Sequence, residues 1–479
     1  MHAAVLAAVA RCTATIPISW RKAVKKILCS GILVFVVGFS CAPSQAGPYA
    51  QLSSSENQSG GTTPKAVTLN QDDAVRGISN ANGTITFAES GTYFVMAAAQ
   101  VGSTDGKGKG TVRLWMRQNG EDVSNSNTEQ TITPGFTAVL VCQGVAEIKA
   151  GDKLELAFSA SKGSSGLGLI ASKPKGEPSV PSMIFSAFKV GDKAYAQLSS
   201  GDTQTAGAAG QTITLNQTDS SNEIENQNGV VTMKKAGTYF VMAAGQVGAT
   251  EAGGKGTVRL WVRQNREDVS NSNTEQTSVG GFTGVLVCQG IMECKAGDKV
   301  ELMQASSGSG LGMVASTPQG EPVVPSMILS IVEVESAYAQ LSSTASQAGA
   351  AAGKVITLNQ TDSAKGVENA NGTITVKDAG LYFLVAAGQV ASTDATVKAG
   401  TSRLWLRQNG KDVDNSNTEQ SVTGKYTAVL VCQGVGEVKA GDKLQLFQSA
   451  MGAGVGMIAT KPKGEPVVPS TIFSLIKVD

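Results

Sequence analysis

The residue types that could carry chemistry in this sequence are few. The 479-residue chain contains one histidine, His2, and seven cysteines. We expect His2 to be removed with an N-terminal segment, so Ser-His-Asp triads, Cys-His nucleophiles and histidine-ligated zinc are unavailable to the mature chain. Three cysteines, Cys142, Cys288 and Cys432, follow the same apolar Val-Leu-Val run. This setting favours small buried side chains over reactive thiolates, and we do not expect a disulfide between Cys288 and Cys294.

Paired carboxylates and glycine-rich segments do not supply a reaction either. Glu121-Asp122 and Glu267-Asp268 lie at a predicted turn, where they form a solvated rim. The glycine-rich segments 106–110 and 308–312 lack the Gly-Lys-Ser/Thr ending of a phosphate-binding loop. We therefore predict that the protein is not an enzyme. A hydrolase that uses paired carboxylates is the remaining enzymatic alternative.

Calcium is the one cofactor that the sequence permits, because it binds carboxylate, amide and carbonyl oxygens. An Asp-x-x-Asn-x-Asn-x-Glu pattern occurs three times. The candidate ligands are Asp122, Asn125, Asn127, Glu129, Asp268, Asn271, Asn273, Glu275, Asp412, Asn415, Asn417 and Glu419. The spacing differs from that of an EF-hand loop. The alternative is that these short polar side chains cap a turn and line a wet strand face.

The N-terminus resembles a secretory signal. Four basic residues between Arg21 and Lys26 precede the apolar stretch 27–40, and a Ser-Gln-Ala sequence ends at Ala46 before Gly47. The apolar stretch is shorter than the about 20 residues that a membrane-spanning helix needs. We expect cleavage between Ala46 and Gly47 and a mature protein that is secreted, extracellular or at the cell surface, or periplasmic in a Gram-negative bacterium.

Two observations limit the partners. Lys plus Arg number 39 and Asp plus Glu 38, so the net charge of +1 does not indicate a nucleic-acid partner. No later apolar run is long enough to predict a membrane span. Cys41 is an alternative lipid-modified residue, but Gly38-Phe39-Ser40 before it lacks the aliphatic residue of such signals.

Three repeats account for the mature chain. Tyr-Ala-Gln-Leu-Ser-Ser begins at Tyr49, Tyr195 and Tyr338, and four further motifs recur in the same order. The interval is a domain length, well above the 20–50 residues typical of solenoid repeats. We predict four segments: a signal peptide at 1–46 and jelly-roll domains at 47–192, 193–335 and 336–479.

The local patterns within a repeat are those of strands. Residues 355–358 and 373–376 are rich in β-branched side chains, and Asn371-Gly372 is a hairpin-type dipeptide. A second turn, Gly441-Asp442, separates the apolar runs 427–435 and 444–447. We therefore predict an all-β fold of three tandem jelly-roll β-sandwiches, each with roughly eight to ten strands.

One strand of each repeat is too apolar for an ordinary sandwich. In 92–99, 238–244 and 381–387 both faces are apolar, whereas a sandwich strand normally alternates. We expect the equivalent faces of the three repeats to cover one another in an intrachain pseudo-trimer, unless an extra strand or loop of the same domain covers each face. The predicted contact residues are Tyr93, Phe94, Tyr239, Phe240, Tyr382 and Phe383.

The ordered motifs resemble the globular-head domain of complement first component subunit q. They comprise Asn371 to Phe383, with its Ala-Gly-Leu-Tyr-Phe ending, Gly388-Gln389-Val390, Ala428-Val429-Leu430, Gly441-Asp442-Lys443-Leu444 and Ile472-Phe473-Ser474-Leu475. The tumour necrosis factor superfamily has a similar Gly-Leu-Tyr strand. The resemblance implies a ten-strand jelly roll that forms compact trimers, with calcium often bound near the apex. The chain lacks the family's Gly-x-y stalk and carries three copies.

Two functions fit these features. The first is an exported, non-enzymatic recognition or adhesion protein that binds an extracellular protein or glycan. Specificity would then lie in the loops 103–109, 249–255 and 392–398, which differ among the repeats. The alternative is a structural subunit of an extracellular surface layer, fibre or matrix, in which the apolar faces join separate chains.

Overall fold

The computed structural model describes residues 47–161, 166–334, 336–394 and 396–479. The predicted signal peptide at 1–46 lies outside the described residues, together with Cys41 and Ala46, so cleavage before Gly47 stays a prediction. Across the described ranges, no helix has the length and apolar character needed to span a membrane.

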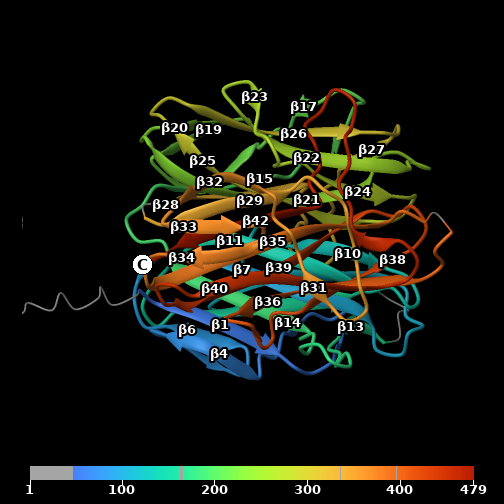
Figure 1. Cartoon of the computed structure of the whole chain (residues 1–479), viewed down its shortest axis with the longest axis horizontal. Coiled ribbons are helices and arrows are strands. Elements are labelled where there is room, and N and C mark those ends of the chain that lie inside the picture. The colour runs from blue at the N-terminus through green and yellow to red at the C-terminus, as the bar shows by residue number, and fades with distance from the viewer. Residues whose placement is uncertain (1–46, 162–165, 335, 395) are drawn as a thin grey trace, which may run out of the picture. The chain divides into compact units, whose positions relative to one another are not determined.

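Each repeat folds into two seven-stranded sheets, and the chain is all-β over the residues described (Figure 1). The prediction of three tandem jelly-roll β-sandwiches is confirmed. All three repeats belong to one compact unit. The domain boundaries 47–192, 193–335 and 336–479 stay predictions, and "repeat 1", "repeat 2" and "repeat 3" denote these ranges below.

The strands follow the same order in every repeat. The strands of repeat 1 are β1 (Tyr49–Ser54), β2 (Gln58–Ser59), β3 (Lys65–Ala66), β4 (Gln71–Arg76), β5 (Ile78–Ala81), β6 (Thr84–Phe87), β7 (Gly91–Ser103), β8 (Gly110–Gln118), β9 (Glu121–Asp122), β10 (Thr128–Ile132), β11 (Ala138–Ile148), β12 (Lys153–Ala160), β13 (Leu167–Leu169) and β14 (Met183–Lys189). Those of repeat 2 are β15 (Tyr195–Ser200), β16 (Gln204–Thr205), β17 (Gln211–Thr212), β18 (Gln217–Asn222), β19 (Ile224–Gln227), β20 (Val230–Met233), β21 (Gly237–Ala249), β22 (Gly256–Gln264), β23 (Glu267–Asp268), β24 (Thr274–Ser278), β25 (Gly284–Cys294), β26 (Lys299–Ser306), β27 (Leu311–Met313) and β28 (Met327–Val334). Those of repeat 3 are β29 (Tyr338–Ser343), β30 (Gln347–Ala348), β31 (Lys354–Val355), β32 (Gln360–Lys365), β33 (Val367–Ala370), β34 (Thr373–Val376), β35 (Gly380–Ser392), β36 (Gly400–Gln408), β37 (Lys411–Asp412), β38 (Thr418–Val422), β39 (Ala428–Val438), β40 (Lys443–Met451), β41 (Val455–Met457) and β42 (Thr471–Lys477).

The sheets of repeat 1 show the topology shared by all repeats. One sheet runs β2-β13-β7-β14-β1-β4, with β11 paired along the other side of β7. The second sheet runs β10-β8-β12-β6-β5, with β3 added to β12 and β9 added to β8. Because β11 pairs with β7 alone, it is an edge strand, and its outer side needs other partners.

The hairpin expected at Asn371-Gly372 forms between β33 and β34. Both turn residues adopt positive φ values, 51° at Asn371 and 98° at Gly372, as a tight hairpin turn requires. A Cβ atom at Gly372 would lie 2.2 Å from the carbonyl oxygen of Ile356, so only glycine fits there.

The predicted strand at 355–358 is wrong beyond Val355. Residues 356–358 have no regular strand structure, although Ile356 and Leu358 are fully buried. The side chain of Gln347 takes the place of a partner strand, because its Oε1 accepts the Thr357 N–H at 2.7 Å and its Nε2 donates to the Thr357 carbonyl at 3.1 Å. The β-branched apolar run 355–358 therefore forms a buried irregular segment after Val355.

Buried glutamines join the repeats in a cyclic order. Gln143 of β11 donates from Nε2 to the carbonyl oxygen of Met242 in repeat 2 at 2.8 Å. The equivalent bonds join repeat 2 to repeat 3 and repeat 3 to repeat 1: Gln289 to Val385 at 2.9 Å and Gln433 to Met96 at 3.0 Å. The contacts thus close a ring within one chain, and we call each inter-repeat contact a seam.

A second set of glutamines pairs with backbone across the seams. Gln246 of repeat 2 accepts the N–H of Glu129 at 3.0 Å and donates to its carbonyl at 2.8 Å. Gln389 makes the same two bonds with Glu275, and Gln100 makes them with Glu419. Each side chain therefore acts as a short piece of strand for the neighbouring repeat.

The apolar strands of the three repeats meet through their phenylalanines. The ring centroids of Phe94, Phe240 and Phe383 lie 5.4–6.1 Å from one another, and the rings meet edge to face. One continuous apolar cluster contains residues of all three repeats. Tyr93 instead packs on Phe87 of its own repeat.

The other tyrosines of the predicted contact set also bond within their own repeats. The hydroxyl of Tyr239 donates to the Lys235 carbonyl at 2.7 Å, and that of Tyr382 donates to the Asp378 carbonyl at 2.8 Å. Alternation along the strand explains the division, because neighbouring side chains point to opposite faces.

We predict that Phe240→Asp destabilises the protein by about 4 kcal/mol, since it leaves a charge in an apolar contact and removes an aromatic ring. Glu251→Asp, a change in an exposed loop, is the control. Thermal and urea unfolding of both variants measure the difference. Equal and small effects would show that the strand face is not buried between repeats.

Candidate functional site

The aspartates of the predicted calcium motif are bound by side chains of their own repeat. Asp122 lies on β9, where its Oδ1 accepts from Trp115 Nε1 at 2.7 Å and from Arg117 Nε at 3.0 Å. The equivalent contacts are those of Asp268 with Trp261 and Arg263, and of Asp412 with Trp405 and Arg407. Each aspartate therefore fixes the turn onto the preceding strand.

The first asparagine of the motif bridges to the next repeat. Nδ2 of Asn125 donates to Asp219 Oδ1 in repeat 2 at 2.7 Å. The equivalent bonds are Asn271 to Asp362 at 2.6 Å and Asn415 to Asp73 at 2.7 Å. Asn125 has a φ of 58°, a left-handed conformation that asparagine tolerates better than most residues. The turn of the turn-capping alternative is present, but its wet strand face is not, because Asn127 and Glu129 are 0% and 6% exposed. The bond between repeats has no counterpart in the local sequence pattern.

The second asparagine reaches a backbone carbonyl across the seam. Asn127 donates to the Pro322 carbonyl at 2.8 Å, and Asn273 and Asn417 donate to Pro466 and Pro178 at the same distance. The three acceptors belong to the recurring Gly-Glu-Pro motif. That motif therefore serves as a contact between repeats.

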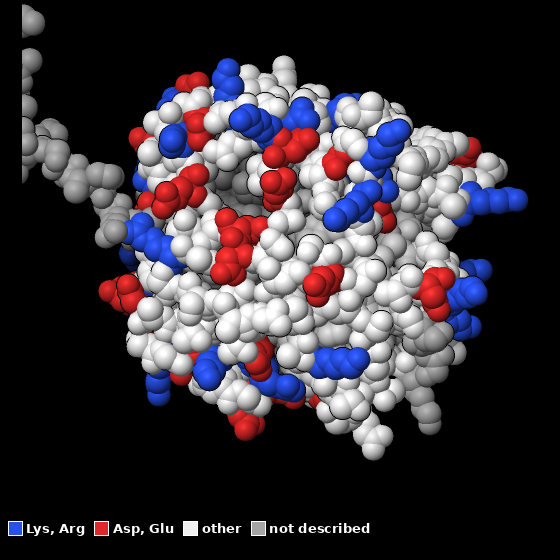
Figure 2. Space-filling view, turned by 90° about the horizontal axis from the view of Figure 1, so that it is seen from below, with Lys and Arg blue, Asp and Glu red and all other residues white. Residues whose placement is uncertain are grey.

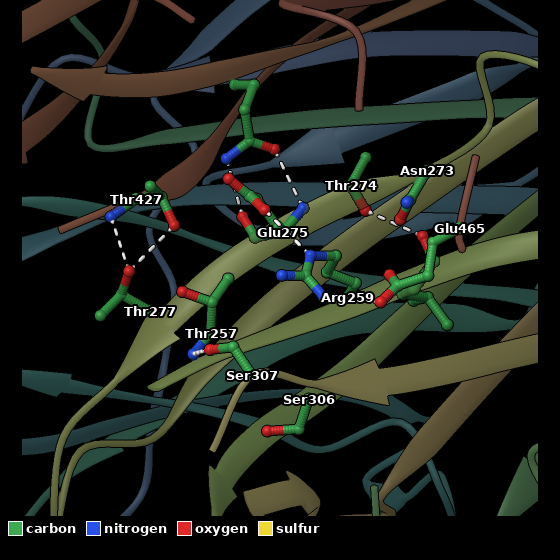
Figure 3. A network of polar contacts seen from close by, with 12 residues as sticks. Thr257, Arg259, Asn273, Thr274, Glu275, Thr277, Ser306, Ser307, Thr427 and Glu465 are labelled. Atoms are coloured by element: carbon green, nitrogen blue, oxygen red, sulfur yellow. Dashed lines mark hydrogen bonds and ion pairs between the residues drawn. The ribbon is translucent and has the colours of Figure 1, made fainter. Parts of the chain in front are cut away.

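The glutamate of the motif shares an arginine with a second glutamate. Arg259 Nε lies 3.2 Å from Glu275 Oε2, and its Nη1 lies 2.8 Å from Glu465 Oε1 of repeat 3. Figure 3 shows this network, in which Thr277 and Thr427 also face each other across the seam. The other seams repeat it: Arg113 with Glu129 and Glu321, and Arg403 with Glu419 and Glu177.

One guanidinium therefore faces two buried carboxylates, which leaves a negative charge uncompensated. Burial raises the pKa of Glu275 and of Glu465, although Arg259 acts in the opposite direction on both carboxyls. Glu465 Oε2 is buried without a hydrogen-bond partner in the described part of the chain. These carboxyls accept a proton more readily in the folded protein than in the unfolded chain.

The twelve candidate calcium ligands are thus divided among a turn, two kinds of seam bond and an ion-pair network. Within the described residues, no group of three or more His, Cys, Asp or Glu side chains is placed to hold a metal ion. Calcium binding stays an untested prediction for these residues.

The segments before β11, β25 and β39 form a second aromatic cluster. The ring centroids of Phe136, Phe282 and Tyr426 lie 5.4–6.4 Å apart, each pair in an edge-to-face arrangement. In the β7–β11 ladder, Ala138 pairs with Val101 and Val145 with Phe94, so this cluster lies at the end opposite the Phe94 cluster. We call this end the apical end.

Hydroxyl pairs join the repeats beside the apical aromatics. Thr131 and Thr283 lie with their Oγ1 atoms 3.0 Å apart, and the Thr131 N–H donates to the Thr283 carbonyl at 2.8 Å. The equivalent pairs are Thr277 with Thr427 and Thr137 with Ser421. Every seam is therefore closed by hydrogen bonds at its apical end.

The three loops that differ among repeats lie at this same end, because they follow β7, β21 and β35. In loop 103–109, Asp105 accepts hydrogen bonds from Ser103 and from the N–H groups of Lys107 and Gly108. Hydrogen bonding lowers the pKa of Asp105. Loop 103–109 is therefore held by its own polar contacts.

The cysteines of the described chain are buried and free. Cys142 donates from Sγ to the Ser126 carbonyl at 3.2 Å, and Cys288 and Cys432 make the equivalent bonds to Ser272 and Ser416. Burial raises the pKa of the Cys142 thiol to about 12. These groups therefore help to position the seam turns, and a thiolate is disfavoured.

No protein-family model matches the sequence, and no curated protein matches it at a significant level. Among solved structures, the chain is similar to murine APRIL at pH 5.0, with 11% identity and a TM-score of 0.22 over 29% of this chain and 98% of that one. It is also similar to the globular domain of the zebrafish complement 1qA protein, with 16% identity and a TM-score of 0.21 over 29% and 96%. The fold assignment itself rests on the strand order above.

The buried carboxylates predict a pH dependence. Because the pKa values of Glu275 and Glu465 are raised, their protonation favours folding. That contribution is complete below the ordinary value of 4.5 and is lost as the pH rises through the raised values. We expect Glu465→Gln to reduce the rise in the thermal midpoint between neutral pH and pH 4.5.

Asp298→Asn is the control of opposite sign. The Lys295 N–H and Asn265 lower the pKa of Asp298, so its ionised form favours folding and that contribution is lost as the pH falls below the ordinary value of 3.8. This variant should lower the thermal midpoint above pH 3.8, and its difference from the unmodified protein should shrink as the pH falls below that value. Identical midpoint profiles for Glu465→Gln and the unmodified protein would contradict the buried-carboxylate interpretation.

We expect chelation to leave the thermal midpoint unchanged, because the aspartates and glutamates of the motif are already bound by tryptophan and arginine side chains. Differential scanning calorimetry with EDTA and then with excess calcium measures this. A rise in the midpoint with calcium that Asp122→Asn abolishes would instead establish the metal site.

Proposed function

We propose that the chain is an exported, non-enzymatic binding protein, in which three jelly rolls form a single-chain pseudo-trimer that presents its apical loops to an extracellular protein or glycan. The observation that carries this proposal is the cyclic closure of the seams beneath three loops of different sequence. A scaffold held by buried contacts can support variable loops, which is where binding specificity is commonly found.

The loops differ in chemistry while their supports agree. Loop 103–109 contains one aspartate and two lysines, loop 249–255 contains a glutamate and one lysine, and loop 392–398 contains an aspartate, a valine and one lysine. In the third loop, the Val397 carbonyl accepts the Gly424 N–H at 2.7 Å, which ties the loop to the segment before β39. Three unlike loops on one platform favour an asymmetric ligand.

The structural-subunit alternative receives less support. It requires apolar strand faces that join separate chains, but Phe94, Phe240 and Phe383 are fully buried within one chain. The large apolar side chains exposed in the described ranges are Val75, Val279, Val323 and Met451, which belong to different strands and loops. Scattered exposed residues of this kind are normal on a soluble protein.

Size-exclusion chromatography with light scattering on residues 47–479 tests the closed pseudo-trimer. We expect the mass of one chain across a wide range of protein concentration, because the seams are satisfied internally. A particle of three chains, or a series that grows with concentration, would support assembly between chains and contradict the proposal.

Replacement of loop 103–109 by a Gly-Ser segment of equal length tests the binding role. We expect the free energy of unfolding to change by less than about 1 kcal/mol, since the replaced residues are mostly exposed. Binding to arrayed glycans and extracellular matrix proteins should be reduced relative to the unmodified chain. Loops 249–255 and 392–398 are replaced in the same way. If all three replacements bind the panel as the unmodified chain does, the assignment of binding to the apical end is wrong.

A further inference from the structure

The seam between repeat 3 and repeat 1 contains a groove of about 260 Å³. Gln51, Asp73 and Ala74 form one wall, and residues of β35, β36, β39 and the 413–416 turn form the other. Strand β39 contacts both β14 and β1 of repeat 1. Gly436 of this groove pairs with Tyr382, at the end of the ladder opposite the apical loops. The groove is therefore separate from the surface proposed above.

The floor of the groove is apolar. A groove of about 420 Å³ lies in the equivalent place between repeats 1 and 2, but the counterparts of Leu384 and Val438 do not line it. Leu384 is 8% exposed and Val438 is 7% exposed. The equivalent residues of repeat 1, Val95 and Ile148, are 0% and 2% exposed. Leu406 and Leu444 complete the floor. An apolar floor in a concave site is the usual property of a small-molecule pocket.

One small residue widens this floor. Gly436 stands where repeat 1 has Ala146 and repeat 2 has Met292. A Cβ atom built on Gly436 would have no neighbour within 4 Å. The space beside Gly436 is therefore free, and a methionine side chain there would project into the groove.

The rim of the groove is acidic. Asp73, Asp414 and Glu437 line it, and no lysine or arginine does. Asp414 replaces the serines found at Ser124 and Ser270 in the other two repeats. Figure 2 shows the face that carries β4, where acidic side chains border a hollow.

Two further contacts define the electrostatics of the rim. The Arg76 guanidinium lies 3.9 Å from Glu437, and both side chains are substantially exposed, so this pair neutralises the rim weakly. Gln433 lines the groove and is fully buried, and its Oε1 accepts no hydrogen bond from the residues described. The site therefore offers negative charge above an apolar floor.

We propose that this groove binds a small amphipathic organic amine, with the apolar body on the Leu384 floor and the ammonium group facing the carboxylates of Asp73 and Asp414. The charge excludes organic anions, and an uncharged analogue gains only the apolar contact. The enclosed volume suits a ligand with one short aliphatic or aromatic body.

Isothermal titration of residues 47–479 with 2-phenylethylamine tests the proposal, with 2-phenylethanol and 3-phenylpropionate as isosteric controls. We expect the amine to bind roughly tenfold more tightly than the alcohol, and the carboxylate to give no heat of binding. Equal binding of amine and alcohol, or displacement of the amine by calcium, would overturn the proposal.

Two variants that borrow residues from the other repeats locate the site. Asp414→Ser removes the added charge and should weaken amine binding about tenfold, and Gly436→Met should fill the groove and abolish binding. Ser124→Asp installs the charge in the equivalent groove between repeats 1 and 2, where Ala146 and Ile148 take the places of Gly436 and Val438, and should add no second amine site. Thermal midpoints verify that each variant folds.

Unchanged amine affinity in both Asp414→Ser and Gly436→Met would refute the groove as the site. Replacement of the apical loop 103–109 should leave amine affinity unchanged, which separates this proposal from the apical binding function. A loop replacement that removes amine binding would place the amine at the apical end and likewise overturn the proposal.

Discussion

The structure depends on how an edge strand is satisfied when its outer side is buried. β11, β25 and β39 each pair with one strand only, and their outer sides lie against another repeat. Unpaired backbone groups in such a place are costly. Glutamine is suited to this position, because its amide offers the same donor and acceptor as a peptide group. Gln197 accepts the Val145 N–H in the first seam, and Gln51 does so for Val435 in the third.

The same constraint explains why charge lies inside the seams. The glutamine amides pair the backbone of the seam. The other polar side chains there need protein partners in place of water, and Arg259 is the partner of both Glu275 and Glu465. A single arginine shared by two carboxylates stabilises less than separate pairs would, since one charge remains buried. The network instead fixes how two neighbouring repeats align, because the arginine and one glutamate come from one repeat and the second glutamate comes from the next. We infer that specificity of packing, more than stability, is what this network supplies.

Much of this fold follows from local sequence, and the seams largely do not. Strand β34 and its Asn371-Gly372 turn were readable because β-branched residues and hairpin dipeptides act locally. The burial of Phe240 was readable from a strand with two apolar faces. The roles of Asn125 and Gln143 were missed, because their partners lie about a hundred residues away and no periodicity encodes them. One signal was available: a glutamine that follows an apolar Val-Leu-Val-Cys run needs a buried partner.

Covalent fusion of the repeats explains the differences among the seams. In a trimer of identical chains, any substitution appears three times around the axis, so a charge or cavity that helps one interface burdens all three. In this chain Tyr426 stands beside Phe136 and Phe282 in the apical cluster, and burial raises its pKa. Gly436 and Asp414 likewise change one seam, where another seam has Ala146 and Ser124. Two seams can therefore keep their contacts while the groove of the third acquires a different floor and a further carboxylate.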